Sequence, residues 1–169
     1  MILLPMMLLQ IGFGSPGHIY RPSADQLRID RGFSMVLIDT LYLDARGFMK
    51  LDRSGACLAS ISCETMDKSG VRYTFGGETM NRRFVIAKTV RAADYLWKSI
   101  PALGIGQFRD KPMVMAAVGR ETRGAPFDCR PDASGELCIL PLKPGRIEIS
   151  FDTDGKLLQA SLIGYDDYP

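Results

Sequence analysis

The sequence predicts an α+β protein made of two tandem modules, each a helix followed by an antiparallel sheet. The main observation is a unit that occurs twice in one order: a helix-capping residue, an apolar stretch, an Arg-Gly pair, two cysteines and a Gly-led alternating strand. Gly70 and Gly145, which open the two strands, are 75 residues apart. Self-similarity at a fixed period is typical of duplicated supersecondary units. We therefore expect a first module with a linker over residues 15–100 and a second over residues 101–169.

Composition is the second observation. The chain has 169 residues, of which 46% are hydrophobic and 24% charged, as in an ordinary globular protein that buries a core. The net charge of +2 is small, and the sequence has no run of Lys and Arg with interleaved aromatic residues that could bind along a phosphate backbone. The sequence therefore predicts no nucleic-acid partner.

The N-terminal run over residues 1–14 is apolar and has two interpretations. It is too short to span a bilayer, which takes about 20 apolar residues, so no stable membrane span is predicted. It resembles the apolar core of a secretory signal peptide, with a small-x-small cleavage site ending at Gly14. No Lys or Arg precedes the run, however, so either the start codon lies further upstream or the run is a buried N-terminal strand. The first interpretation predicts a periplasmic or secreted protein, and the second a cytoplasmic one.

The four cysteines form two close pairs, Cys57 with Cys63 and Cys129 with Cys138. In an oxidising compartment they indicate two local disulfides, each contributing at most about 2–3 kcal/mol by loop-closure entropy. Four cysteines permit three pairings, and the sequence alone does not select one. Reduced cysteines buried in a cytosolic core are the alternative. Neither pair has the tight gap of a zinc knuckle, so no metal site is predicted.

The first module begins with a short polar helix that Ser23 caps. We expect it to run through Arg31, with Leu27 as its main apolar contact, and to end at Gly32. Ser34 then caps an apolar stretch over residues 34–46, which fits a buried helix if the repeat is real and a strand otherwise.

Two alternating strands follow, over residues 70–75 and 83–90, joined by a hairpin at Gly76-Gly77. Residues 92–100 are expected to form a linker helix that buries Trp97 and ends before Pro101.

The second module begins with a helix that has Asp110 at its N-cap and Pro112 in its first turn. Gly119 or Gly124 is expected to stop it. One face of this helix is predicted to carry Met113, Ala117 and the stem of Arg120.

The last strand pair gives the clearest pattern in the sequence. Ile147, Ile149 and Phe151 alternate toward one face, residues 152–155 make a turn, and residues 156–164 return. The tail over residues 165–169 is expected to fray.

No motif in the chain predicts a catalytic, cofactor-binding or metal-binding residue. The single histidine, His18, has no neighbouring nucleophile or carboxylate motif. The acidic sequence from Asp152 to Gly155 lacks most ligands of a calcium loop and is better explained as a turn. The pair Gly104 and Gly106 lacks the third glycine of a nucleotide-binding loop.

The order of these features resembles two known groups of proteins. The residues concerned are Gly32-Phe33-Ser34, Asp110, the cysteine pairs and the stretch from Phe151 to Leu157. They resemble the BamE (SmpA/OmlA) family of small outer-membrane-assembly lipoproteins. Two tandem copies, each with a local disulfide, are similar to the β-lactamase inhibitory proteins. The resemblance covers residues 32–164 and implies a protein-binding role; no binding residue of either group carries over to a named position, and the lipid-bearing cysteine of BamE is missing.

The resulting hypothesis is an exported, non-enzymatic domain of the cell envelope with a protein-binding or structural role and no cofactor. Its concave sheet face is expected to bind a protein partner, with Arg72, Tyr73, Trp97 and Glu148 as candidate contacts. The alternative is a cytosolic small-ligand-binding protein or enzyme with four reduced cysteines.

Overall fold

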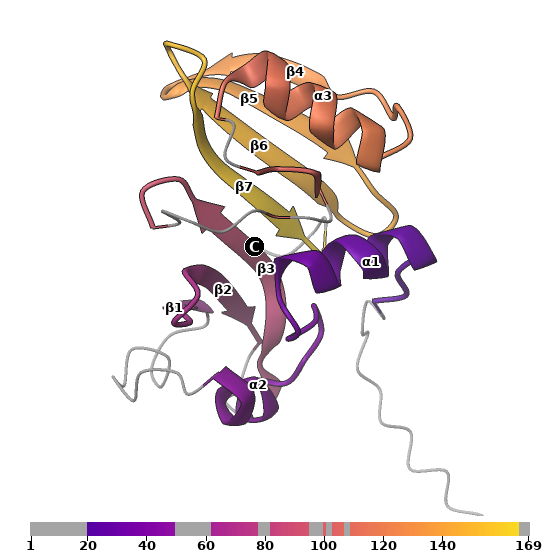
Figure 1. Ribbon diagram of the computed structural model, residues 1–169. Helices are drawn as coiled ribbons and strands as arrows, with labels where there is room; N and C mark the ends of the chain where they lie inside the picture. Colours follow the sequence, from indigo (N-terminus) through magenta and orange to yellow (C-terminus); the bar gives the residue numbers. More distant parts are fainter. Residues whose placement is uncertain are drawn as a thin grey trace, which may run out of the picture.

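The computed structural model of the chain describes residues 20–49, 62–77, 82–94, 100, 103–106 and 109–165. This part contains three helices and one seven-stranded antiparallel sheet (Figure 1), which confirms the predicted α+β class. The helices are α1 (Ala24–Phe33), α2 (Tyr42–Met49) and α3 (Lys111–Glu121). The strands are β1 (Ser62–Met66), β2 (Val71–Gly76), β3 (Phe84–Arg91), β4 (Asp128–Asp132), β5 (Gly135–Pro141), β6 (Arg146–Asp152) and β7 (Leu157–Ile163).

The two halves of the chain share a single sheet. Its order is β1-β2-β3-β7-β6-β5-β4, so each half contributes a meander and the last strand of each half lies at the centre. There β3 pairs with β7 over five residues, with Val90 opposite Ala160. The predicted modules therefore do not have separate sheets within the described residues.

Local backbone geometry matches at several corresponding positions of the halves. Gly70 and Gly145 precede β2 and β6 with φ values of 86° and 85°. Each of these strands also has a register shift one residue before a fully buried phenylalanine, at Phe75 and at Phe151. These likenesses are the structural counterpart of the sequence repeat, whose origin by duplication stays a prediction.

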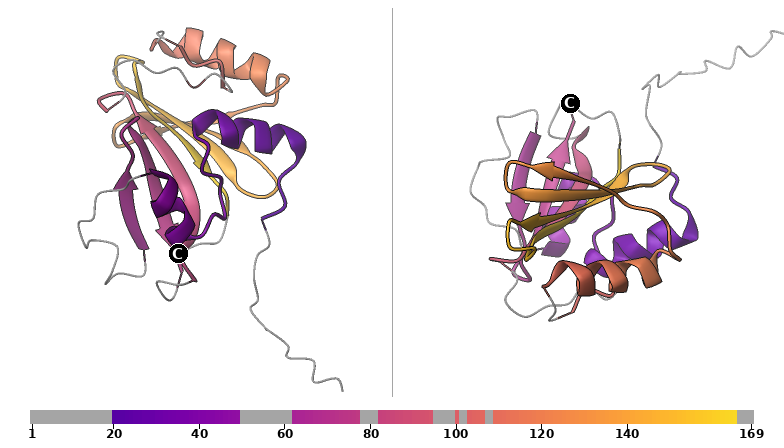
Figure 2. Two further views of the ribbon diagram at one scale, coloured as in Figure 1. Left: turned by 60° about the horizontal axis from the view of Figure 1, so that its bottom comes forward. Right: turned by 90° about the horizontal axis from the view of Figure 1, so that it is seen from above.

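All three helices lie on one face of the sheet, which we call the helix face. Figure 2 shows α1 and α3 side by side there, and the ring of Tyr42 in α2 meets that of Phe75 edge-on at 5.0 Å. The strands turn their apolar residues to this face because side chains alternate along a strand. Val71, Tyr73 and Phe75 in β2 and Ile147, Ile149 and Phe151 in β6 are all fully buried.

Helix α1 begins at the predicted residue. The Ser23 hydroxyl accepts a hydrogen bond from the backbone N–H of Gln26 at 3.2 Å, and the Gln26 side chain accepts one from the Ser23 N–H at 2.7 Å. This reciprocal capping box satisfies two N–H groups that a helix start leaves free. The predicted apolar contact and end are wrong, because α1 buries Ile29 and Phe33 rather than Leu27 and continues past Gly32.

The predicted cap at Ser34 is wrong. Ser34 is the residue that ends α1, and its backbone N–H donates to the carbonyl of Asp30. The chain after it is irregular up to the bridge at Leu41, because its backbone groups are bonded elsewhere. The N–H of Asp39 donates to Val85 in β3, for example, and the N–H of Ile38 to the Asp30 carboxylate.

Helix α3 follows Asp110 with Pro112 in its first turn, as predicted. It buries Val114, Ala117 and Val118, whereas Met113 is 44% exposed. Of the three residues predicted on the buried face, Ala117 is buried but Met113 and Arg120 are exposed. The buried face is therefore shifted by about one residue from the predicted one. The helix ends at Glu121, between the two glycines considered as stops.

The strand predictions over residues 70–75, 83–90 and 145–164 are confirmed. The turn between β6 and β7 forms as expected, since the Asp152 carboxylate accepts hydrogen bonds from the N–H groups of Asp154 and Lys156. Strands β1, β4 and β5 were not predicted as separate elements. The run over residues 1–14, His18, residues 95–99 with Trp97, and the tail beyond Tyr165 lie outside the described residues. The described ends of the predicted linker helix are not helical, since residues 92–94 form a turn and Ile100 forms a bridge with Ile105. Tyr165, which was expected to fray, is buried, and its hydroxyl donates to Asp39 at 2.7 Å.

Candidate functional site

The face of the sheet opposite the three helices is the candidate binding surface, and we call it the open face. Because side chains alternate, Arg72 and Thr74 point there when Tyr73 points to the helix face. The strand register extends this assignment across the sheet, pairing Arg72 with Thr89, Thr89 with Ser161, and Ser161 with Glu148. The open face thus carries Glu64, Met66, Arg72, Thr74, Ala87, Thr89, Arg91, Leu137, Ile139, Arg146, Glu148, Ser150, Gln159, Ser161 and Ile163.

Of the four predicted contact residues, two lie on this face. Arg72 in β2 and Glu148 in β6 are separated by β3 and β7, so about 14 Å lies between their strands at roughly 4.8 Å per strand. Tyr73 is wrong: it is fully buried on the helix face, and its hydroxyl donates to Asp67 at 2.8 Å. Neighbouring strand residues point to opposite faces, so Arg72 and Tyr73 cannot both serve one surface. Trp97 lies outside the described residues.

Ion pairs hold the arginines of the open face in place. Arg72 contacts Asp94 at 2.6 Å and Glu64 at 3.2 Å, and the hydrogen bond from Arg72 lowers the pKa of Asp94 below its ordinary value. Across the sheet, Arg146 contacts Glu148 at 2.6 Å. These pairs are partly exposed, where an ion pair contributes little to stability and more to the orientation of its charges.

The centre of the open face is polar but uncharged. The hydroxyls of Thr89 and Ser161 lie 2.9 Å apart across the β3–β7 junction, with Thr89 half-buried and Ser161 only 4% exposed. Beyond β6, Leu137 and Ile139 of β5 add half-buried apolar side chains. Small, partly buried polar groups in the middle, fixed charges on either side and an apolar strip beyond the charges of β6 can contact a protein surface of mixed polarity.

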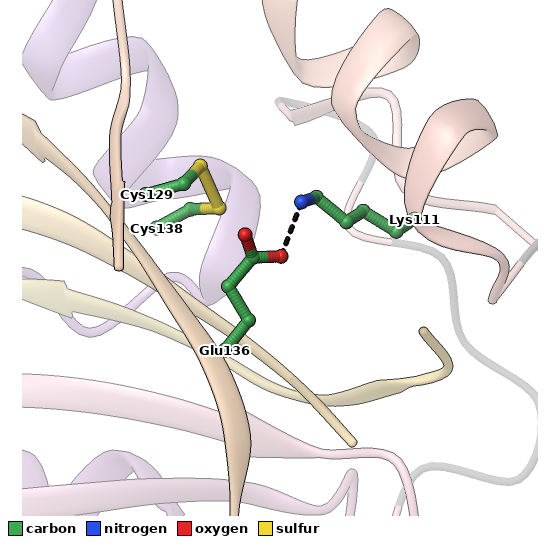
Figure 3. Close-up of a disulfide and its surroundings, with 4 residues drawn as sticks. All are labelled: Lys111, Cys129, Glu136 and Cys138. Carbon is green, nitrogen blue, oxygen red and sulfur yellow. Dashed lines mark hydrogen bonds and ion pairs between the residues drawn. A yellow bond between two sulfur atoms is a disulfide. The ribbon is translucent and has the colours of Figure 1, made fainter. Parts of the chain in front are cut away.

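A disulfide lies on the helix face of the sheet, at the edge formed by β4. The structure joins Cys129 to Cys138, as predicted, and the two residues are directly opposite in the β4–β5 hairpin, with Cα atoms 4.0 Å apart. Figure 3 shows the carboxylate of Glu136 beside the sulfurs, with the Lys111 ammonium paired to it. One carboxylate oxygen of Glu136 and the two sulfurs all lie within 4.8 Å of one another.

This cluster was missed because the hairpin was not predicted. The sequence from Asp132 to Gly135 carries the signal: the Asp132 carboxylate accepts hydrogen bonds from the N–H groups of Ser134 and Gly135, as in an Asx turn. Once the turn is placed, Glu136 and Cys138 fall on one face by their spacing of two. Cys63 is also disulfide-bonded, and its predicted partner, Cys57, lies outside the described residues.

A buried ion pair underlies the centre of the sheet. Lys88 of β3 and Asp30 of α1 are both fully buried, with Nζ 2.5 Å from a carboxylate oxygen of Asp30. The ammonium also donates to the backbone carbonyls of Asp30 at 2.9 Å and Ser34 at 3.4 Å. Burial raises the pKa of Asp30 and lowers the pKa of Lys88, although the opposite charge of each partner counteracts the shift. The pair ties α1 to the central strand and has no exposed atom with which to meet a ligand.

None of the helices in the described part of the chain is long and apolar enough to cross a membrane. No known family model, curated protein or solved structure matches the chain. The resemblance to BamE and to the β-lactamase inhibitory proteins therefore stays a prediction, and the assignment of function rests on the geometry described above.

Proposed function

We propose that this protein is an exported, non-enzymatic domain of the cell envelope that binds another protein through the open face of its sheet. The observation that carries the proposal is the arrangement of the sheet itself. All three described helices cover one face, while the other carries partly exposed fixed charges, an apolar strip and a hydroxyl pair of which Ser161 is buried. A broad surface of this composition suits protein recognition better than the binding of a small molecule, which uses concave pockets.

Two further observations support the non-enzymatic and exported parts of the proposal. The most deeply buried charged groups among the described residues, Asp30 and Lys88, satisfy each other and contact no solvent-accessible space. The Cys129–Cys138 disulfide is the form that an oxidising compartment favours, where small domains use such bonds for stability.

The test is capture of a partner from envelope extracts of the native host, with matched charge-reversal variants. Glu148→Lys changes the open face, whereas Arg28→Glu reverses a charge of a more exposed ion pair on the helix face, with side chains 43% and 36% exposed against 32% and 20% for the Arg146–Glu148 pair. We expect the wild type and Arg28→Glu to retain the same protein and Glu148→Lys to lose most of it. Equal loss with both variants, or retention with both, would place the binding surface elsewhere.

A further inference from the structure

The β4–β5 hairpin brings together three side chains that can ligate a metal ion once the disulfide is reduced. Cys129 and Cys138 are separated by nine residues in sequence, but the antiparallel register places them opposite each other. Glu136 is two residues before Cys138 on the same strand and points to the same side, as Figure 3 shows. The register thus adds Glu136 to a cysteine pair that the sequence had already predicted.

The chemistry of this donor set is specific. Two thiolates and one carboxylate suit borderline-soft divalent cations such as Zn²⁺, which bind Cys sulfur at about 2.3 Å and carboxylate oxygen at about 2.0–2.2 Å. The candidate donor atoms lie within 4.8 Å of one another, somewhat more than the roughly 3.8 Å between ligands of a tetrahedral ion with 2.3 Å bonds, so side-chain movement after reduction can bring them to one ion. Three protein ligands leave the fourth position open to water.

We propose that reduction of the Cys129–Cys138 disulfide converts this hairpin into a binding site for a thiophilic divalent cation, with the two thiolates and Glu136 as ligands. A dithiol reductant supplies two electrons and two protons to the S–S bond, which breaks to give two thiols, while the reductant becomes a disulfide. The incoming cation then displaces the two thiol protons, and Glu136 exchanges its ion pair with Lys111 for the metal.

The surroundings allow both steps. Cys129 is exposed, so a reductant thiolate can attack its sulfur, whereas Cys138 is fully buried and is the leaving sulfur. The side chains of Lys111 and Glu136 are 35% and 29% exposed, so their ion pair lies at the surface where a hydrated cation can reach it. This site lies on the helix face and does not depend on what the open face binds.

The experiment uses the full-length chain, reduced with dithiothreitol, desalted anaerobically and titrated with Co²⁺ as the spectroscopic probe. We expect thiolate-to-cobalt charge-transfer absorption at one ion per chain, which Zn²⁺ abolishes by displacement, and none in the oxidised chain. Glu136→Gln should weaken binding at least about tenfold. Lys111→Met should bind as tightly as the wild type or more tightly, because it removes only the competing cation.

Two variants separate this site from the other cysteines. Cys129→Ser/Cys138→Ser should not bind Co²⁺ through thiolate, whereas Cys57→Ser/Cys63→Ser should bind as the wild type does. The proposal is overturned if the double variant at 129 and 138 binds like the wild type, or if Glu136→Gln has no effect. Far-UV circular dichroism accompanies each titration, and a reduced chain that loses its sheet signal and binds no cobalt overturns it as well.

Discussion

Single residues at the centre of the molecule have a disproportionate effect on its stability. Lys88 and Asp30 are both fully buried, and each has the other as its compensating charge. Removal of one member of such a pair leaves an uncompensated charge in the interior, at a cost of about 3–5 kcal/mol. Replacement of both by apolar residues of similar size removes the charge and its desolvation penalty together.

This predicts a strongly non-additive double-mutant cycle. Lys88→Met and Asp30→Leu should each lower the free energy of unfolding by about 3–5 kcal/mol, while the double variant should lose less than either single one. Urea denaturation monitored by circular dichroism measures all four free energies. Additive losses would mean that the two side chains contribute independently, contrary to the contact between them.

Glycine positions give a second residue-scale prediction with a built-in control. A Cβ at Gly145 would lie 2.0 Å from the carbonyl oxygen of Ile163, and the residue has a φ of 85°. Gly145→Ala should therefore destabilise the fold by more than about 1 kcal/mol, because backbone on both sides must move. Gly119→Ala, in the interior of α3 with nothing within 4 Å, should stabilise it by about 0.5–1 kcal/mol. Thermal unfolding of both variants should show shifts of opposite sign.

At the scale of elements, the sequence predicted what local chemistry determines. The helix cap at Ser23 and the turn after Asp152 depend on residues within three or four positions, and both were predicted. Of the stretch over residues 34–46, for which helix and strand were both open, only the second half is helical, in α2; its first half bonds to β3 and to Asp30, which are distant or buried partners that no local pattern shows.

The candidate surface was predicted only in part for a related reason. Arg72 and Tyr73 point to opposite faces of β2, and the one that faces the helices depends on the side on which the helices pack. The alternating sequence pattern alone does not decide this, because a tyrosine can lie on either a buried or an exposed face. The Glu136–cysteine cluster required the register of β4 against β5, which is a tertiary fact.

The β4–β5 hairpin yields a prediction at this scale. Its disulfide closes a loop between directly opposite residues of the exposed edge strand β4 and its neighbour β5, so its loss should act mainly through the unfolded chain. Cys129→Ser/Cys138→Ser should lower the free energy of unfolding by about 2–3 kcal/mol. Because the free energy of global unfolding falls, the slowest amides of β3 and β7 should exchange faster by the same amount as those of β4, about 2–3 kcal/mol in exchange free energy. Unchanged exchange of the slowest amides in β3 and β7 would show that the bond stabilises only this edge.

For the whole molecule, the decisive feature is the pairing of β3 with β7. It makes one sheet from two meanders that the sequence predicted as separate modules, and both halves bury a phenylalanine completely beside a matching register shift. Two independently stable modules would each have their own core and sheet edge. A shared central ladder instead couples the halves, since neither can unfold without exposing the last strand of the other.

The matched phenylalanines allow this coupling to be measured. Phe75→Leu and Phe151→Leu should each destabilise the protein by about 1 kcal/mol, the usual cost of a modest change in core shape. If the molecule unfolds as one unit, each variant lowers the exchange free energies of the slowest amides in both β3 and β7 by the same amount. If each variant affects only the amides of its own half, the chain consists of two stable modules joined edge to edge, and the continuous sheet is then an interface between them.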